Sequence, residues 1–181
     1  ITATRRTLLV GSKSPEISRR AKQLFAADSP GPRSEAIAKY REALRLPGDR
    51  QRGLGVYQRQ CANCHRLEGQ GHDVGPNLET IRHRVADELL VNILDPNREV
   101  SPNYVEYVAT LEDGRVLTGI IVTETPAGFV LRRAQGMEES LLREQIESLV
   151  GVGKSLMPEG LEKNISVPEM ADLLAYLRSL K

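Results

Sequence analysis

The segment Cys61-Ala62-Asn63-Cys64-His65 constrains this chain more than any other feature, because it contains both cysteines and one of the three histidines. Two thiols three residues apart, followed at once by an imidazole, are compatible with half of a zinc site, a redox dithiol, or covalent attachment of a haem. No other cysteine is available for a structural disulfide. The residues around this segment must therefore decide between the three chemistries.

Zinc and dithiol chemistry both fit the surrounding sequence poorly. Zinc needs further ligands, and His72 and His83 do not have the compact spacing of a usual second ligand pair. A thioredoxin-like dithiol follows a strand and opens a helix, whereas these cysteines follow a segment with a helical pattern. We interpret His72 and His83 as exposed side chains without a role in a site.

A haem accounts for the spacing directly. The two thiols add across the two vinyl groups of one porphyrin edge, and the adjacent imidazole then becomes an iron ligand. Pro76, in the sequence Gly-Pro-Asn-Leu, can supply the backbone carbonyl that fixes the second ring nitrogen of His65. Met157 lies in a loop rich in Gly and Pro, so its thioether is the candidate sixth ligand. Met170 instead fits an apolar helix face, and Met137 follows a turn glycine.

The composition excludes several classes of function. Lys plus Arg is 25 and Asp plus Glu is 24, so the chain has no net field to attract nucleic acid or an anionic membrane. No run of 18 apolar residues predicts a membrane span.

Trp is absent and Phe plus Tyr total only seven, which leaves room in the core for a large flat apolar cofactor. The start at Ile1, without a leader, indicates a processed or excised piece.

Helical patterns occupy both ends of the chain. Two helical pieces are expected within 12–46, and Asp49 can cap a third helix that leads to Cys61. A fourth helix is expected at about 85–94. The last begins with Ser166 and Glu169 in capping-box spacing. Gly53 on the third helix permits a close crossing, and the last helix is its natural partner.

The middle of the chain has a strand pattern instead. Apolar and polar residues alternate on both sides of Asp113-Gly114, which is a signal for a hairpin with a two-residue turn. Two further strands are expected near 129–132 and 140–143. The pattern predicts a small antiparallel β module between about 103 and 150. Its role is open: a docking surface, a cover over part of a cofactor, or added bulk.

The order of these features resembles a class I cytochrome c. More narrowly, the chain is similar to the haem-binding domain at the C-terminal end of large secreted planctomycete and verrucomicrobial proteins. The resemblance covers about 47–181 and rests on "GDRQRGLGVYQRQCANCHRL", "GHDVGPNLETI", "ILDPNREV", "LEDGRVLTGII", "SLMPEGL" and "EMADLLAYLRSL". It implies a mainly α fold, in which the class I cytochrome c helices carry the inserted β module. Residues 1–46 then form an additional helical segment, which suits the end of a helical repeat region.

The resemblance also implies a function. One haem c would be attached through Cys61 and Cys64, with His65 and Met157 as axial ligands, and the domain would transfer single electrons rather than catalyse a reaction. Around the ring we expect an apolar wall and an arginine that pairs with the propionates. The wall candidates are Tyr57, Leu78, Ile81 and Leu90, and the arginine candidates are Arg82 and Arg84.

Location and partners follow from the same resemblance and from the chemistry of attachment. Covalent haem attachment is completed outside the cytoplasm, so we expect a periplasmic or exported protein. The expected partner is a redox protein or an attached dehydrogenase domain that supplies electrons. The alternative is a haem enzyme or gas sensor of peroxidase type, in which Met157 dissociates or never binds and the sixth position stays open.

Overall fold

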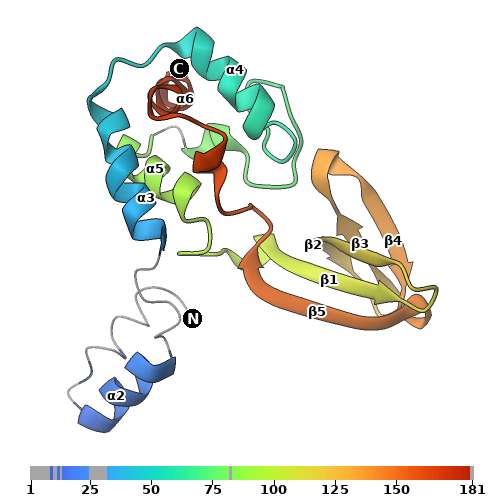
Figure 1. Cartoon of the computed structure of the whole chain (residues 1–181). Coiled ribbons are helices and arrows are strands. Elements are labelled where there is room, and N and C mark those ends of the chain that lie inside the picture. Colours follow the sequence, from blue (N-terminus) through green and yellow to red (C-terminus); the bar gives the residue numbers. More distant parts are fainter. Residues whose placement is uncertain (1–8, 10–11, 13, 25–31, 82, 180–181) are drawn as a thin grey trace.

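The computed structural model describes residues 9, 12, 14–24, 32–81 and 83–179, and contains helices at both ends and a sheet between them (Figure 1). The helices are α2 (Pro15–Leu24), α3 (Pro32–Tyr40), α4 (Arg50–Gln60), α5 (Ala86–Leu94) and α6 (Val167–Arg178). The strands are β1 (Val105–Leu111), β2 (Val116–Glu124), β3 (Gly128–Arg132), β4 (Glu138–Leu142) and β5 (Ile146–Ser155). Short 3₁₀ turns include Arg41–Arg45, Leu78–Ile81, Pro102–Tyr104 and Leu161–Lys163.

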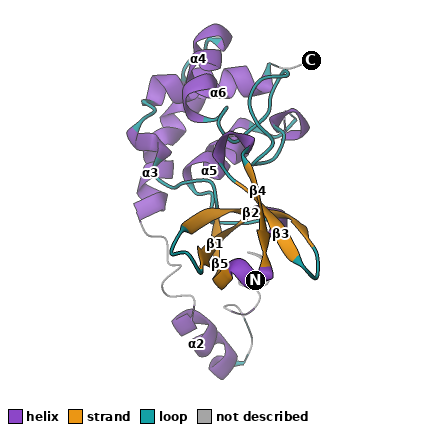
Figure 2. Ribbon diagram, turned by 90° about the vertical axis from the view of Figure 1, so that its right-hand side faces the viewer, coloured by secondary structure: helices purple, strands orange, loops and turns teal. Residues whose placement is uncertain are grey.

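Helices α3 to α6 gather around one hydrophobic core, and the sheet lies beside them (Figure 2). The core is built mainly from the inner faces of α4, α5 and α6. Its fully buried members include Val56, Tyr57, Leu89, Leu90, Leu94, Met170 and Leu173. Within the described residues, no helix is long and apolar enough to cross a lipid bilayer.

The expected helix starts at Asp49 and Ser166 are confirmed. The Asp49 carboxylate accepts a hydrogen bond from the Arg52 backbone N–H at 2.8 Å, which satisfies one of the free donors at the start of α4. At α6, the Glu169 N–H donates to the Ser166 hydroxyl at 3.4 Å, and the Glu169 carboxylate accepts from the Ser166 N–H at 2.8 Å. This is the capping box that the spacing predicts.

Helices α4 and α6 cross closely at Gly53, as the sequence predicts. A Cβ atom at this position would lie 2.0 Å from the Asp172 carbonyl oxygen and 2.8 Å from the Tyr176 Cβ. Only a glycine lets the two backbones approach this far. The crossing brings Tyr57 and Tyr176 together, with ring centroids 5.6 Å apart and planes tilted by 48°. It therefore sets the position of α4, which leads directly into Cys61.

Replacing Gly53 with Ala should destabilise the fold by about 1–3 kcal/mol or more, because the new methyl group meets backbone atoms that cannot move aside. Gly55 on the same helix is a matched control, since the nearest atom to its added Cβ is the flexible Arg59 Nη1 at 3.5 Å. Gly55→Ala should be neutral or stabilising by up to about 1 kcal/mol. Chemical denaturation of both variants measures the difference. Equal stabilities would contradict the close crossing.

A partly buried ion pair also joins α4 to α6. Asp172 is 4% exposed and accepts two hydrogen bonds from the Arg52 guanidinium, at 2.8 and 2.9 Å. The Asp49 backbone N–H donates to the same carboxylate at 2.7 Å. The hydrogen bonds from Arg52 are the main reason that the pKa of Asp172 is held below its usual value, against the raising effect of burial. The carboxylate is therefore charged and fully paired at neutral pH.

Asp172→Ala should destabilise the protein by about 1–3 kcal/mol, because the Asp49 backbone N–H loses its acceptor, whereas the Arg52 side chain is 66% exposed and is solvated by water. The folded pKa lies below the unfolded value of about 4, so this contribution is present above pH 4 and disappears as the pH falls through the folded pKa. The variant should therefore lose less stability in acid than the wild type. The exposed pair of Arg41 and Asp87 is the control, and Asp87→Ala should cost less than about 1 kcal/mol. Urea titrations between pH 2 and 7 measure both effects.

In the described residues, the middle of the chain forms a five-stranded antiparallel sheet with the strand order β4-β3-β2-β1-β5. The sheet has a hydrophobic cluster of its own, separate from the helical core. The buried members of this cluster are Ala109, Leu111, Leu117, Phe129, Leu131 and Leu141. The sheet is thus a second structural layer and not an elaborated loop.

The predicted mainly α fold is wrong: the structure combines its helices with a full antiparallel sheet. The prediction gave the β module four strands and ended it at about 150, whereas β5 continues to Ser155. The sequence does not predict β5, because Gly151 and Gly153 interrupt its alternation of apolar and polar residues and most of its side chains are exposed. Its pairing with β1 across Val105 and Ser155 is what enlarges the sheet.

The first hairpin also differs in detail from the prediction. The turn between β1 and β2 is longer than two residues, since the Leu111 N–H donates to the Arg115 carbonyl at 2.9 Å. Gly114 has a φ of 84° and its N–H donates to the Leu111 carbonyl at 2.9 Å. A glycine in this left-handed conformation is typical of a three-residue hairpin loop with a bulge. The Asp113-Gly114 signal therefore located the turn correctly but not its length.

Candidate functional site

The Cys61–His65 segment forms one tight turn at the end of α4. The Cys61 N–H donates to the Tyr57 carbonyl at 2.8 Å, which closes the helix. The Cys64 and His65 N–H groups then both donate to the Cys61 carbonyl, at 3.0 and 2.9 Å. Both thiols are half-buried and free of a disulfide. One short turn therefore presents two thiols and an imidazole together.

The His65 ring is fixed by the Gly75-Pro76 segment. Its Nδ1 lies 2.8 Å from the Pro76 carbonyl oxygen. Because a carbonyl only accepts hydrogen bonds, Nδ1 carries the proton and Nε2 keeps a free lone pair. The ring also lies against Gly75, where an added Cβ would come within 2.5 Å of Cε1 and 2.8 Å of Nδ1. Gly75 thus leaves the space that the ring occupies, and Pro76 sets its orientation.

Backbone hydrogen bonds hold this returning segment against the cysteine turn. The Val74 and Gly75 N–H groups both donate to the Cys64 carbonyl, at 3.0 and 2.6 Å. Further on, the Leu78 N–H donates to the Arg66 carbonyl at 3.0 Å. The distance between the imidazole and its acceptor is therefore determined by main-chain hydrogen bonds to the residues that flank His65 in sequence.

Tyr57 anchors the same loop from the core. Its side chain is completely buried, and its hydroxyl lies 2.7 Å from the His65 carbonyl and 3.0 Å from the Gln70 carbonyl. Gly71, with a φ of 85°, permits this approach, because a Cβ there would lie 2.1 Å from the His65 carbonyl. Burial, followed by the nearby Cys61, raises the pKa of Tyr57 to about 12. The hydroxyl therefore stays protonated and donates a hydrogen bond to one of the two carbonyl oxygens.

The ionisable groups of the turn are held in their neutral forms. Burial, and secondarily the neighbouring Cys64, raises the pKa of the Cys61 thiol to about 12. Burial also raises the pKa of the Cys64 thiol. For His65, burial lowers the pKa, although the Pro76 carbonyl acts in the opposite direction. A neutral imidazole with a free Nε2 is the form that coordinates metals.

Met157 lies two residues beyond the end of β5, in a loop that is tied to the end of α5. Met157 is half-buried, and its N–H donates to the Ser155 hydroxyl at 3.1 Å. The Asn97 side chain accepts from the Ser155 N–H at 2.8 Å and donates to the Glu159 carboxylate at 2.7 Å. Asn97 thus holds the chain on both sides of Met157. Asn97 was not among the predicted site residues, although it lies in "ILDPNREV", one of the segments that carry the resemblance.

The remaining candidate residues occupy different environments. Leu78 and Leu90 belong to the buried helical core, and Ile81 packs against it from a half-buried position. Arg84 forms an ion pair with Glu88 at 3.3 Å, and Arg82 lies outside the described residues. His72 and His83 are both exposed. In the part of the chain that the structure describes, no three His, Cys, Asp or Glu side chains converge as metal ligands.

Comparison with known protein families gives one match that bears on this turn. Residues 50–111 match the family model for cytochrome c. The match supports a cytochrome c, and a cytochrome c domain implies a haem-binding electron-transfer module with covalently bound haem. It begins at the start of α4, includes Cys61, Cys64, His65 and Pro76, and ends at the last residue of β1. Cytochrome c domains are typically exported proteins. Met157 and α6 lie beyond the matched residues.

Proposed function

We propose that this chain is a c-type cytochrome domain that carries one haem, attached through thioether bonds at Cys61 and Cys64, and transfers single electrons. His65 and Met157 are the proposed axial ligands. The observation that carries the proposal is the hydrogen bond between His65 Nδ1 and the Pro76 carbonyl, which leaves Nε2 free beside two thiols in one turn. The family match to residues 50–111 supports the same assignment.

The residues present suit a haem in chemical terms. The thiols are neutral and half-buried, so they are protected from oxidation until they add to the vinyl groups. Gly75 leaves space for the imidazole beside the backbone, and Pro76 sets its tautomer. The soft thioether of Met157 stands in a loop that hydrogen bonds hold at both ends.

With both axial positions filled, no coordination position would remain for oxygen, peroxide or a substrate. Haem, when bound, would supply a one-electron couple at its iron, and the Met157 thioether together with the His65 imidazole would favour a higher reduction potential than two imidazoles. The protein would hold the ligands, shield the iron from water and expose one edge to its partner. We therefore propose electron transfer in preference to a haem enzyme or gas sensor.

Production of the exported protein in cells that attach haem c tests the proposal. The expected result is a mass increase of one haem that survives denaturation, with a low-spin ferric spectrum and a Met-to-iron charge-transfer band. Cys61→Ser together with Cys64→Ser should abolish covalent attachment. A covalent haem with a high-spin ferric spectrum that binds carbon monoxide rapidly would favour the sensor or enzyme instead. An unmodified mass in the wild type would overturn the proposal.

We further propose that the domain works in the periplasm or outside the cell, as a module of a larger oxidoreductase system. The narrower likeness to planctomycete and verrucomicrobial domains supports this view. Its electron donor would be an attached dehydrogenase domain or a separate redox protein. Mixing the haem-loaded protein with a candidate dehydrogenase domain, and recording the rate of haem reduction by stopped-flow spectroscopy, tests the donor. Cell fractionation tests the location.

A further inference from the structure

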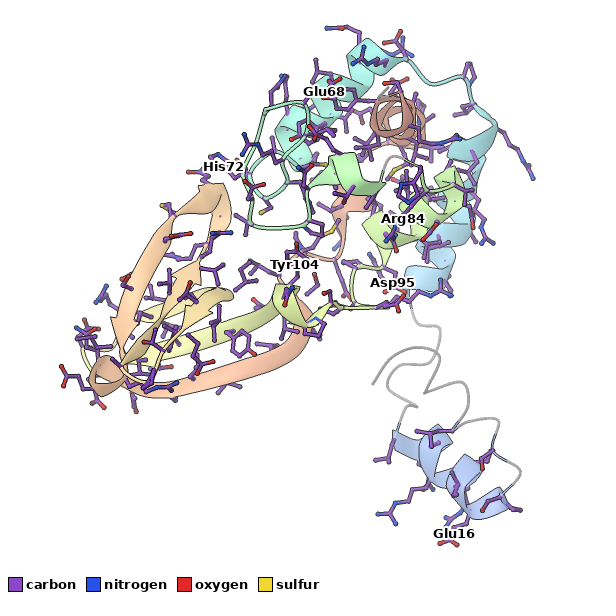
Figure 3. All side chains as sticks on the ribbon, turned by 180° about the vertical axis from the view of Figure 1, so that it is seen from behind. Glu16, Glu68, His72, Arg84, Asp95 and Tyr104 are labelled. Carbon is purple, nitrogen blue, oxygen red and sulfur yellow. The ribbon has the colours of Figure 1, made fainter. Side chains whose placement is uncertain are left out.

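The turn between β3 and β4 rests on the cysteine turn itself. The Gln135 N–H donates to the Asn63 carbonyl at 2.7 Å, and Asn63 stands between the two cysteines. The Arg132 guanidinium donates to the Asp73 carbonyl at 2.7 Å. Beside these contacts, a Cβ at Gly136 would lie 3.3 Å from the His72 ring. Figure 3 shows His72 at the place where this end of the sheet meets the helical part.

The backbone of this turn is shaped for the contact. Gln135 has a φ of 62°, a left-handed conformation that costs a residue other than glycine about 1–2 kcal/mol. The turn is closed by hydrogen bonds from the Arg133 N–H to the Met137 carbonyl at 2.8 Å and from the Gly136 N–H to the Arg133 carbonyl at 3.1 Å. The Gln135 N–H is thereby left to donate outward, to Asn63. Residues in such conformations persist where the surroundings hold them.

The other edge of the sheet, formed by β5 beside β1, leads into the Met157 loop (residues 155–159). β5 ends at Ser155, which is paired with Val105 of β1, and the Leu156 N–H donates to the Tyr104 carbonyl at 3.3 Å. Asn97 binds the same segment from the end of α5. Figure 1 shows the chain leaving β5 and turning toward α6 at this junction, away from the β3–β4 turn.

A ladder of strand pairs, with one register shift between Val105 and Tyr107, connects the two edges of the sheet. Arg132 of β3 is paired with Ile120 of β2, and the adjacent Gly119 is paired with Tyr107 of β1. Two residues before Tyr107, Val105 is paired with Ser155 of β5. Only backbone hydrogen bonds and short stretches of strand separate the contact at Asp73 from the Met157 loop. A hydrogen-bonded sheet moves as a unit more readily than a loop does.

We propose that the sheet is a rigid frame that links the loops carrying the two proposed iron ligands. Its β3–β4 turn holds the His65 loop (residues 63–75), and the end of β5 holds the Met157 loop. This inference rests on the proposed function for the identity of the ligands. Arg132 and Gln135 are positioning residues: they touch the His65 loop but act on the placement of Met157. The frame gives the β module a role that the separate hydrophobic cores of sheet and helices do not suggest.

Arg132→Ala in the haem-loaded protein provides the test, because it removes the contact with Asp73, together with the Arg132–Glu138 ion pair inside the sheet, without altering either ligand. Loss of this link should weaken Met157 ligation, so the apparent affinity for added imidazole at the sixth position should rise about tenfold. The Met-to-iron charge-transfer band should weaken in parallel. Arg132→Lys keeps a charged donor and should restore much of the band.

Arg115→Ala is the matched control. Arg115 lies in the turn between β1 and β2, and its partners Asp113 and Glu139 lie in the same turn and in β4, so neither contact reaches the helical part. Its removal should change the imidazole affinity less than twofold. Gln135→Pro removes the N–H that binds Asn63 and, because proline cannot adopt a φ of 62°, also reshapes the turn, so it should weaken Met157 ligation at least as much as Arg132→Ala. Gln135→Gly keeps the N–H and relieves the left-handed strain, so it should preserve the wild-type behaviour.

Amide hydrogen exchange of the full chain as it is purified separates this inference from the proposed function. Arg132→Ala should speed exchange in residues 63–75 and also in residues 155–159, whereas Arg115→Ala should speed neither. Faster exchange confined to residues 63–75, with an unchanged imidazole affinity in the haem-loaded protein, would overturn the frame. Absence of haem or of Met ligation in the wild type would count against the proposed function alone, because the exchange comparison would still report the link.

Discussion

Replacing Met157 with Ala is expected to lower the reduction potential by on the order of 0.1 V and to open the sixth coordination position. Axial ligands set haem potentials over a range of about 0.8 V, and under the proposed ligation loss of the thioether would remove a ligand that favours the reduced iron. The variant should become high-spin in the ferric form and bind carbon monoxide rapidly when reduced. Potentiometric titration and the visible spectrum measure these changes.

Two other methionines serve as controls for this variant. Met137 is 53% exposed, next to the β3–β4 turn, so Met137→Ala should leave the spectrum and the potential unchanged. Met170 is completely buried in α6, so Met170→Leu should change stability and not ligation. If Met157→Ala instead keeps the wild-type spectrum, the sixth ligand lies elsewhere, and His72 and His83 become the residues to replace next.

Local features of the fold follow from the sequence because they depend on neighbours along the chain. Asp49 and Ser166 cap their helices through backbone groups within three residues, and the side-chain types alone identify them. Gly53 was also a useful signal, since a glycine within a helical pattern needs a reason such as a close crossing. The partner of that crossing followed because the last helix has an apolar face to bury.

Features that depend on distant partners were missed. β5 becomes a strand because β1 offers it a pairing edge, and its own residues, with Gly151 and Gly153, predict little. The Asn97 side chain accepts a hydrogen bond from Ser155, and the Asn63 carbonyl accepts one from Gln135. Both donors lie far away in sequence. An asparagine after a proline carries no sign of which loop it will bind. The mainly α prediction failed for the same reason, because the size of a sheet is decided by pairing.

At the candidate site, the sequence indicated which residue types matter but not how they are held. Pro76 was proposed from the need of a ligating histidine for an acceptor, and its carbonyl lies 2.8 Å from His65 Nδ1 in the structure. The sequence assigned no role to Gly75, because a glycine before a proline is typical of any turn. Its contact with the imidazole is visible only once the returning segment is placed against the cysteine turn.

Gly75→Ala should therefore damage the site severely, with the yield of correctly ligated haem protein falling about tenfold or more. The added Cβ would lie 2.5, 2.8 and 3.0 Å from the Cε1, Nδ1 and Nε2 atoms of His65. The backbone cannot withdraw, because the Gly75 N–H is bound to the Cys64 carbonyl at 2.6 Å. The imidazole must move instead, and it loses its hydrogen bond to Pro76. Haem content per chain and the ferric spectrum measure the loss.

Pro76→Ala is the informative comparison, because it keeps the carbonyl oxygen that accepts from His65 and adds nothing near the ring. It should retain most of the haem content and the low-spin spectrum, with at most a modest fall in stability from the freer backbone. The expected order is wild type, then Pro76→Ala, then Gly75→Ala far below. If Pro76→Ala is the more damaging of the two, the rigidity of the proline ring, and not the space left by Gly75, is what holds the imidazole in place.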